Sequence, residues 1–148
     1  MSITPFKQDF GPLGYNAENK SAFLKAGKKY LNEIFKVLKQ ENPDVAFSAH
    51  INKGGIAVSG EIYGDIRLDS QRGVHVCLTE RLFNQAETPF TLYAQTVRAY
   101  PGELNPKNVG QIVEGNFNVD PHEPERILTM LRGAIRKASE MQANNEAA

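Results

Sequence analysis

The chain has 148 residues, and its 17 lysines and arginines are balanced by 17 aspartates and glutamates. An apolar fraction of 41% and a charged fraction of 23% are ordinary for a globular protein and exclude an intrinsically disordered chain. The length predicts one domain. We divide it into an extended arm at residues 1–17, a folded core at 18–141 and a frayed tail at 142–148.

Cysteine usage and hydropathy indicate the compartment. The single cysteine, Cys77, excludes an internal disulfide and a multi-cysteine metal cluster, and a leftover thiol favours a cytoplasmic location. The first residues carry no basic stretch followed by an apolar one, and no run of 18 apolar residues occurs. We therefore expect neither secretion nor a membrane span.

The N-terminal third predicts an arm followed by a helix. Prolines and glycines in residues 1–15 indicate an extended arm that is ordered only if its apolar side chains dock, namely Phe6, Phe10 and Leu13. From Glu18 to Gln40, apolar residues recur at steps of three and four, which predicts an amphipathic helix. Gly27 lies in the apolar stripe, where it costs about 1 kcal/mol relative to alanine, so we expect close packing there.

The hydrophobic period changes to two after Asn42-Pro43, which indicates the start of a sheet. Residues 45–52 and the run from residue 56 alternate, and Lys53-Gly54-Gly55 between them predicts a tight hairpin turn. Matching the apolar faces places Ile51 opposite Ile56.

The second strand is expected to continue to residue 68. A run of that length exceeds the usual strand of about 5–6 residues, so we expect a bend or bulge at Gly60 and Gly64. A third strand follows at residues 74–78. Matching its apolar face to the preceding strand pairs Leu68 with Val74, and on the polar face this register pairs Arg67 with His75 and Asp65 with Cys77.

The C-terminal part predicts one more strand and a second helix. The strand is expected at Phe90–Arg98, and the segment Pro101–Val119 reads as a long loop with a short strand at residues 111–113. Asp120 and Glu123 can form a capping box for the last helix. The fold prediction is an α+β domain, an antiparallel four-stranded meander with an N-terminal and a C-terminal helix packed on one face.

Candidate binding residues lie on the polar face of the predicted sheet. They are aromatic, basic and acidic side chains that alternate with the apolar set, namely Tyr63, Arg67, His75, Tyr93, His50 and Glu61. The aromatic and basic members could stack and pair with a macromolecule. Cys77 is a poor nucleophile here, because a carboxylate across the strand raises its pKa. Ligand types for a metal are present, but without the spacing of a known motif, so we expect no metal and no cofactor.

The predicted first helix has one cationic face, formed by Lys25, Lys28, Lys29, Lys36 and Lys39. It is either an electrostatic surface for nucleic-acid phosphates or an acidic protein, or a solvated helix face. The zero net charge and the absence of interleaved arginine or aromatic residues favour the solvated face.

Two short segments, Gly54–Ile62 and Gly73–Val76, resemble small domains of unknown function encoded on bacterial plasmids, integrative elements and phages. The resemblance spans about 25 residues, made of a glycine turn and strand alternation. It implies an accessory protein of a mobile element, one that acts against host defence or handles the element's DNA. It assigns no catalytic position and no substrate.

These observations predict a non-catalytic binding module that engages a protein partner through the polar sheet face and the long loop. The balanced charge favours a protein over a nucleic acid. A single-stranded nucleic-acid-binding protein is the first alternative, and a small enzyme using histidine and glutamate groups of the sheet face is the second. An open sheet edge would also allow a homodimer.

Overall fold

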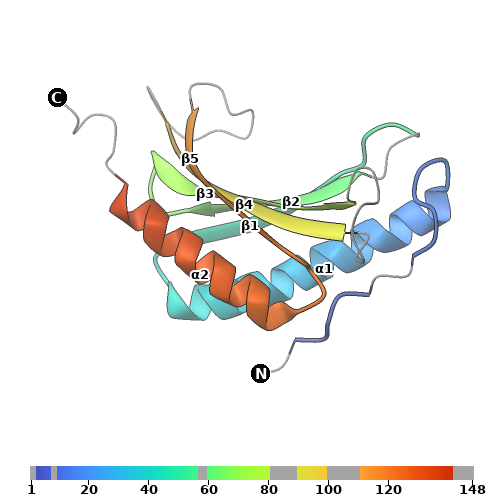
Figure 1. Cartoon of the computed structure of the whole chain (residues 1–148), viewed down its shortest axis with the longest axis horizontal. Helices are drawn as coiled ribbons and strands as arrows, with labels where there is room; N and C mark the ends of the chain where they lie inside the picture. The colour runs from blue at the N-terminus through green and yellow to red at the C-terminus, as the bar shows by residue number, and fades with distance from the viewer. Residues whose placement is uncertain (1–2, 8–9, 57–59, 81–89, 100–110, 142–148) are drawn as a thin grey trace.

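The computed structural model describes residues 3–7, 10–56, 60–80, 90–99 and 111–141. Their elements, in chain order, are α1 (Ala17–Glu41), β1 (Ala46–Asn52), β2 (Glu61–Arg67), β3 (Arg72–Glu80), β4 (Phe90–Ala99), β5 (Gln111–Val119) and α2 (Pro124–Glu140). The strands form one antiparallel sheet in the order β1-β2-β3-β4-β5, and both helices lie on the same side of it (Figure 1). The predicted α+β class and antiparallel meander are confirmed.

The prediction of four strands is wrong, because half of the expected long loop is the fifth strand, β5. A bulge between Thr96 and Val97 of β4 leaves Glu114 without a partner in the register of β4 and β5. An extra residue reverses the alternation of the faces along the bulged strand. The apolar residues of β5 therefore do not follow a single period of two. Residues 101–110, the remainder of the expected loop, lie outside the described residues.

Helix α1 begins and ends close to its predicted limits. The side chain of Asn16 caps the first turn by accepting the backbone N–H of Asn19 at 3.0 Å, and the N–H of Asn42 donates to the Leu38 carbonyl at 2.9 Å. The predicted apolar stripe is buried along its whole length. The predicted close packing at Gly27 is also confirmed, because a Cβ there would overlap Cδ1 of Ile62.

The N-terminal arm docks as its apolar side chains require. Phe6 and Leu13 are buried, and Phe6 joins an aromatic cluster with Phe23 of α1 and Phe90 of β4. The rings of Phe23 and Phe90 stack with centroids 4.9 Å apart. The cluster closes the core at the end where α1 begins.

Helix α2 begins later than its predicted capping box. Glu123 is the N-cap residue and makes no side-chain capping hydrogen bond, and Pro124 occupies the start of the helix. The expected cap at Asp120 is therefore wrong, because proline is already set for the first helical position and the chain enters the helix there. The predicted apolar stripe is buried, namely Ile127, Leu128, Leu131, Ala134, Ile135, Ala138 and Met141.

Both predicted hairpin registers kept the correct faces but slipped along the strand. Ile51 pairs with Ile62 rather than Ile56. The connection from β1 to β2 is longer than a tight turn, because its middle is held against the start of α1 by hydrogen bonds from the Tyr15 N–H to the Ile56 carbonyl and from Lys20 Nζ to the Gly55 carbonyl.

The slip between β2 and β3 has a separate cause. The carboxylate of Asp69 accepts the N–H groups of Gln71 and Arg72, both at 2.8 Å, so the turn begins earlier than expected. As a result Asp65 pairs with His75, and Arg67 pairs with Gly73. The predicted pairs of Arg67 with His75 and of Asp65 with Cys77 are wrong.

Candidate functional site

The strand registers place two rows of residues on the polar face of the sheet. The strand registers align one row across all five strands, namely His50, Tyr63, Cys77, Tyr93 and Asn118. The adjacent row is Ser48, Asp65, His75, Gln95 and Asn116. Both helices lie on the other side of the sheet (Figure 1), so within the described residues no helix covers these rows.

Three rings form a continuous ridge over β1, β2 and β3, which we call the ring ridge (His50, Tyr63 and His75). The centroids of His50 and Tyr63 lie 5.1 Å apart with an interplanar angle of 31°, and those of Tyr63 and His75 lie 6.1 Å apart at 34°. Aromatic contacts at these separations are favourable in tilted arrangements. The ridge is therefore a set of mutually supported, partly exposed aromatic surfaces.

A carboxylate fixes one end of the ring ridge. Oδ1 of Asp65 lies 3.4 Å from Nδ1 of His75, and both side chains are about one-fifth exposed. The hydrogen bond from His75 lowers the pKa of Asp65, against the opposing effect of its partial burial. Asp65 is the residue missing from the predicted binding set, although strand alternation alone places it on this face.

Cys77 is held as a protonated thiol beneath the polar face. It is 1% exposed, and its S–H donates to Oε2 of Glu61 at 3.3 Å. Burial raises the pKa of Cys77 to about 12, assisted by the Glu61 carboxylate and opposed by a hydrogen bond from Tyr93. The expectation of a poor nucleophile agrees with this environment, but desolvation is the main cause, and the neighbouring carboxylate is Glu61 instead of Asp65.

All six predicted binding residues lie on the same face of the sheet. The structure brings His50, Tyr63 and His75 into contact, and it places Glu61 and Tyr93 around Cys77. Arg67 lies at the end of β2, half-buried and opposite Ala46 and Gly73. Among the described residues, no group of three or more histidine, cysteine, aspartate or glutamate side chains is arranged to hold a metal ion.

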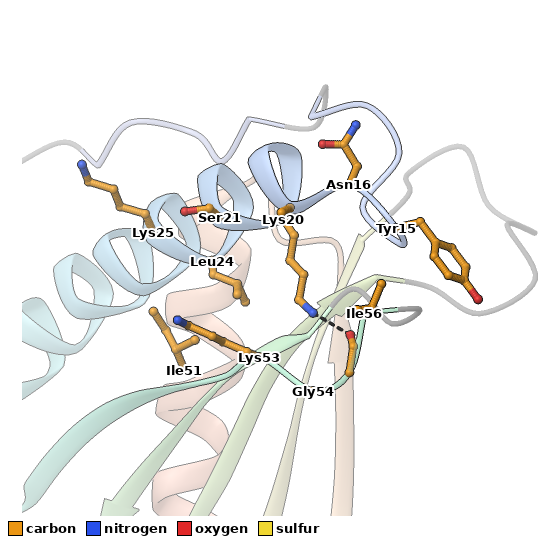
Figure 2. Close-up of a pocket in the computed structure, with 12 residues that line it drawn as sticks. Tyr15, Asn16, Lys20, Ser21, Leu24, Lys25, Ile51, Lys53, Gly54 and Ile56 are labelled. Atoms are coloured by element: carbon orange, nitrogen blue, oxygen red, sulfur yellow. Dashed lines mark hydrogen bonds between the residues drawn. The ribbon is translucent and has the colours of Figure 1, made fainter.

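The predicted lysine face borders two hollows along α1. The first hollow, of about 650 Å³, lies between the start of α1 and the connection after β1 (Figure 2), and its lining includes Lys20, Lys25 and Lys53. The second, of about 570 Å³, is lined by Lys25, Lys28, Lys29, Asn32, Glu33, Lys36 and Ile51. Lys25 and Ile51 belong to both hollows, so the two form one groove beside β1.

Lys39 has a different role from the other four predicted lysines. Its Nζ donates to the carbonyls of Pro43 at 2.8 Å and Val45 at 2.7 Å. It therefore holds the chain between α1 and β1 at the negative end of the helix dipole. Lys39 does not line either hollow, and the cationic surface consists of the remaining lysines.

Comparisons with family models, with curated proteins and with solved structures each find no match to this chain. In the described part of the chain, neither helix is long and apolar enough to cross a bilayer. We therefore infer function from two surfaces of the molecule, the polar sheet face and the groove beside β1.

Proposed function

We propose that the protein is a non-catalytic binding module that engages a protein partner through the polar face of its sheet. The observation that carries the proposal is the ring ridge on a face that the helices leave uncovered. Aromatic side chains held by their neighbours lose little conformational freedom on binding, and such residues contribute most of the binding energy in protein interfaces.

Charge favours a protein over a nucleic acid on this face. Asp65 and Glu61 lie directly beside the rings, and their carboxylates would repel the phosphates of a strand stacked on the ridge. The lysines that could attract phosphates line the groove along α1, in the other layer of the molecule. A hydrogen-bonding partner with basic groups suits the sheet face better.

The chemistry of the face also favours binding over catalysis. Its titratable groups are engaged with one another, Asp65 with His75 and Cys77 with Glu61. Catalytic sites instead gather such groups around a cavity that admits a substrate. The two hollows reported above lie beside α1, away from these pairs. The resemblance to mobile-element domains adds the expectation of an accessory role and assigns no chemistry.

A photocrosslinking experiment tests the proposal. A benzophenone amino acid replaces Tyr63 on the ridge and, in a matched control, replaces Tyr15, which is 80% exposed beside the groove. The expected result is a protein that is captured from position 63 and not from position 15. Truncation of a central interface aromatic costs about 2 kcal/mol or more, so Tyr63→Ala should weaken the purified complex by about 30-fold.

The matched control for affinity is Lys28→Ala plus Lys36→Ala, which changes the groove and leaves the sheet face intact. This variant should bind the captured protein as the wild type does. Unchanged affinity after combined alanine substitution of His50, Tyr63 and His75, with an unchanged melting temperature, would refute the proposal. Capture of a nucleic acid from position 63 would replace the proposal with the nucleic-acid alternative, and capture of a second copy would replace it with a homodimer.

A further inference from the structure

Strand β1 lies at one edge of the sheet. Among the described strands it pairs with β2 alone, and five of its seven residues are exposed. In an antiparallel strand, alternate residues direct their N–H and C=O groups away from the existing neighbour. An open edge of this kind is a template for one more strand.

A cationic flank of α1 runs beside that edge. Ile51 of β1 lines the second hollow together with Lys25, Lys28, Lys29 and Lys36, so the lysines border the strand itself. Glu33 is the one acidic residue of this lining. At about 1.5 Å per residue, Lys25 and Lys36 are about 16 Å apart along the helix. In an extended strand, three side chains that point to the same face span about 14 Å, which is close to this distance.

The first hollow adds an apolar pocket at the end of the same groove. Leu24 of α1 and Ile51 of β1 form its apolar wall (Figure 2), and Ile56 is 78% exposed at its rim. Lys20 closes the pocket by donating from Nζ to the Gly55 carbonyl at 2.8 Å. The pocket therefore combines apolar surface with lysine side chains on the rim.

We propose that this groove binds an extended acidic segment of another protein, which adds to β1 as a sixth strand. Carboxylates on alternate residues face the lysines of α1, and one apolar residue at the end of the same face enters the first hollow. Main-chain pairing with β1 supplies contacts that a nucleic acid cannot make, which favours the peptide. A second copy pairing through β1 would bring two lysine flanks together, and like charges oppose it.

The test uses synthetic peptides and the whole protein. The probe is a labelled octapeptide that alternates glutamate and valine and carries leucine in place of one terminal glutamate. The comparison peptides replace the remaining glutamates with lysine or place a proline at the centre. Fluorescence anisotropy should show binding of the acidic peptide, at least about tenfold weaker binding of the proline peptide, and none of the lysine peptide. Backbone NMR shifts should concentrate in residues 46–52.

Charge-reversal variants locate the contact. Binding of the acidic peptide at low salt should be at least about tenfold weaker in the variant Lys28→Glu plus Lys36→Glu. Binding should be unchanged in the control variant Lys7→Glu plus Arg136→Glu, which has the same change of net charge. A variant with alanine at His50, Tyr63 and His75 should bind the peptide normally, so this inference and the sheet-face proposal fail independently.

Three results would overturn the inference. The first is no binding and no shift in β1 at about 1 mM peptide, which corresponds to a free energy weaker than about −4 kcal/mol. The second is equal binding of the proline peptide, which would indicate charge attraction without strand addition. The third is tighter binding of an oligothymidylate than of the peptide, lost in the same charge-reversal variant, which would assign the groove to nucleic acid.

Discussion

Replacement of Gly64 by alanine tests the packing that positions β2. A Cβ at this position would lie 2.6 Å from Cζ and 2.7 Å from Cε2 of Phe35. The ring cannot easily move aside, because Phe35 is 3% exposed and packs against Phe47 with centroids 5.4 Å apart. The glycine is therefore required by the close approach of α1 to the sheet, and its two neighbouring registers run without a bulge.

The sign of the effect depends on two opposing contributions. Alanine in place of a strand glycine stabilises the folded protein by about 0.5–1 kcal/mol, because it lowers the conformational entropy of the unfolded chain. Overpacking of a buried site destabilises by about 1–3 kcal/mol. The net expectation for Gly64→Ala is a loss of about 1 kcal/mol, which lowers the melting temperature by about 2–4 °C in a chain of this size. Calorimetry or thermal circular dichroism measures it.

Gly133→Ala provides the matched control. Gly133 lies inside α2, and the nearest atom to an added Cβ is Nη2 of Arg136 at 4.0 Å. This variant should gain about 1 kcal/mol from helix propensity alone. In a Phe35→Leu background, Gly64→Ala should no longer destabilise, because the two sites are in contact and their effects do not add. A rise in melting temperature for Gly64→Ala itself would refute the reasoning.

Two further predictions concern the titratable pairs of the sheet face. With a pKa of about 12, the Cys77 thiol is about one part in ten thousand ionised at pH 8, so the native protein should react slowly with iodoacetamide. The Glu61→Gln variant should react as slowly, because burial is the larger cause of the raised pKa, and rapid alkylation of the native protein would contradict this. Because the pKa of Asp65 is lowered in the folded protein, its carboxylate stabilises the fold at pH values above the ordinary aspartate pKa of about 3.9. This stabilisation is lost as the pH falls through the lowered pKa. The difference in urea midpoint between wild type and Asp65→Asn should therefore shrink as the pH falls below that ordinary value, and a constant difference would show that the carboxylate charge contributes nothing.

The helices and the faces of the strands could be predicted because each depends on a local period. Apolar residues at helical spacing identified α1 and α2, and alternation assigned all six binding residues to one face. The residue that starts α2 could not be predicted in the same way. Asp120 and Pro124 both signal a helix start, and the apolar period does not decide between them.

The absolute register depends on turn chemistry that alternation does not contain. A slip of two residues keeps every side chain on its own face, so matching faces leaves several registers equally acceptable. Asp69 selects one for β2 and β3 by accepting two turn N–H groups, and the contacts of Tyr15 and Lys20 with the loop lengthen the connection after β1. The hydrophobic period of the sequence contains no sign of either set of hydrogen bonds.

Errors in register and errors in face have different consequences for function. The membership of the polar face depends only on faces, so it persists although both predicted registers slipped. The ring ridge depends on register as well, because the observed pairing brings His50 and His75 to Tyr63. The pairwise chemistry depends on register, because a shift of two residues moves Asp65 from Cys77 to His75 and leaves the thiol to Glu61. The groove depends on neither, since it arises where the flank of α1 meets the edge of β1. A helix period indicates which lysines share a face, and only the packed structure shows that this face borders an open strand.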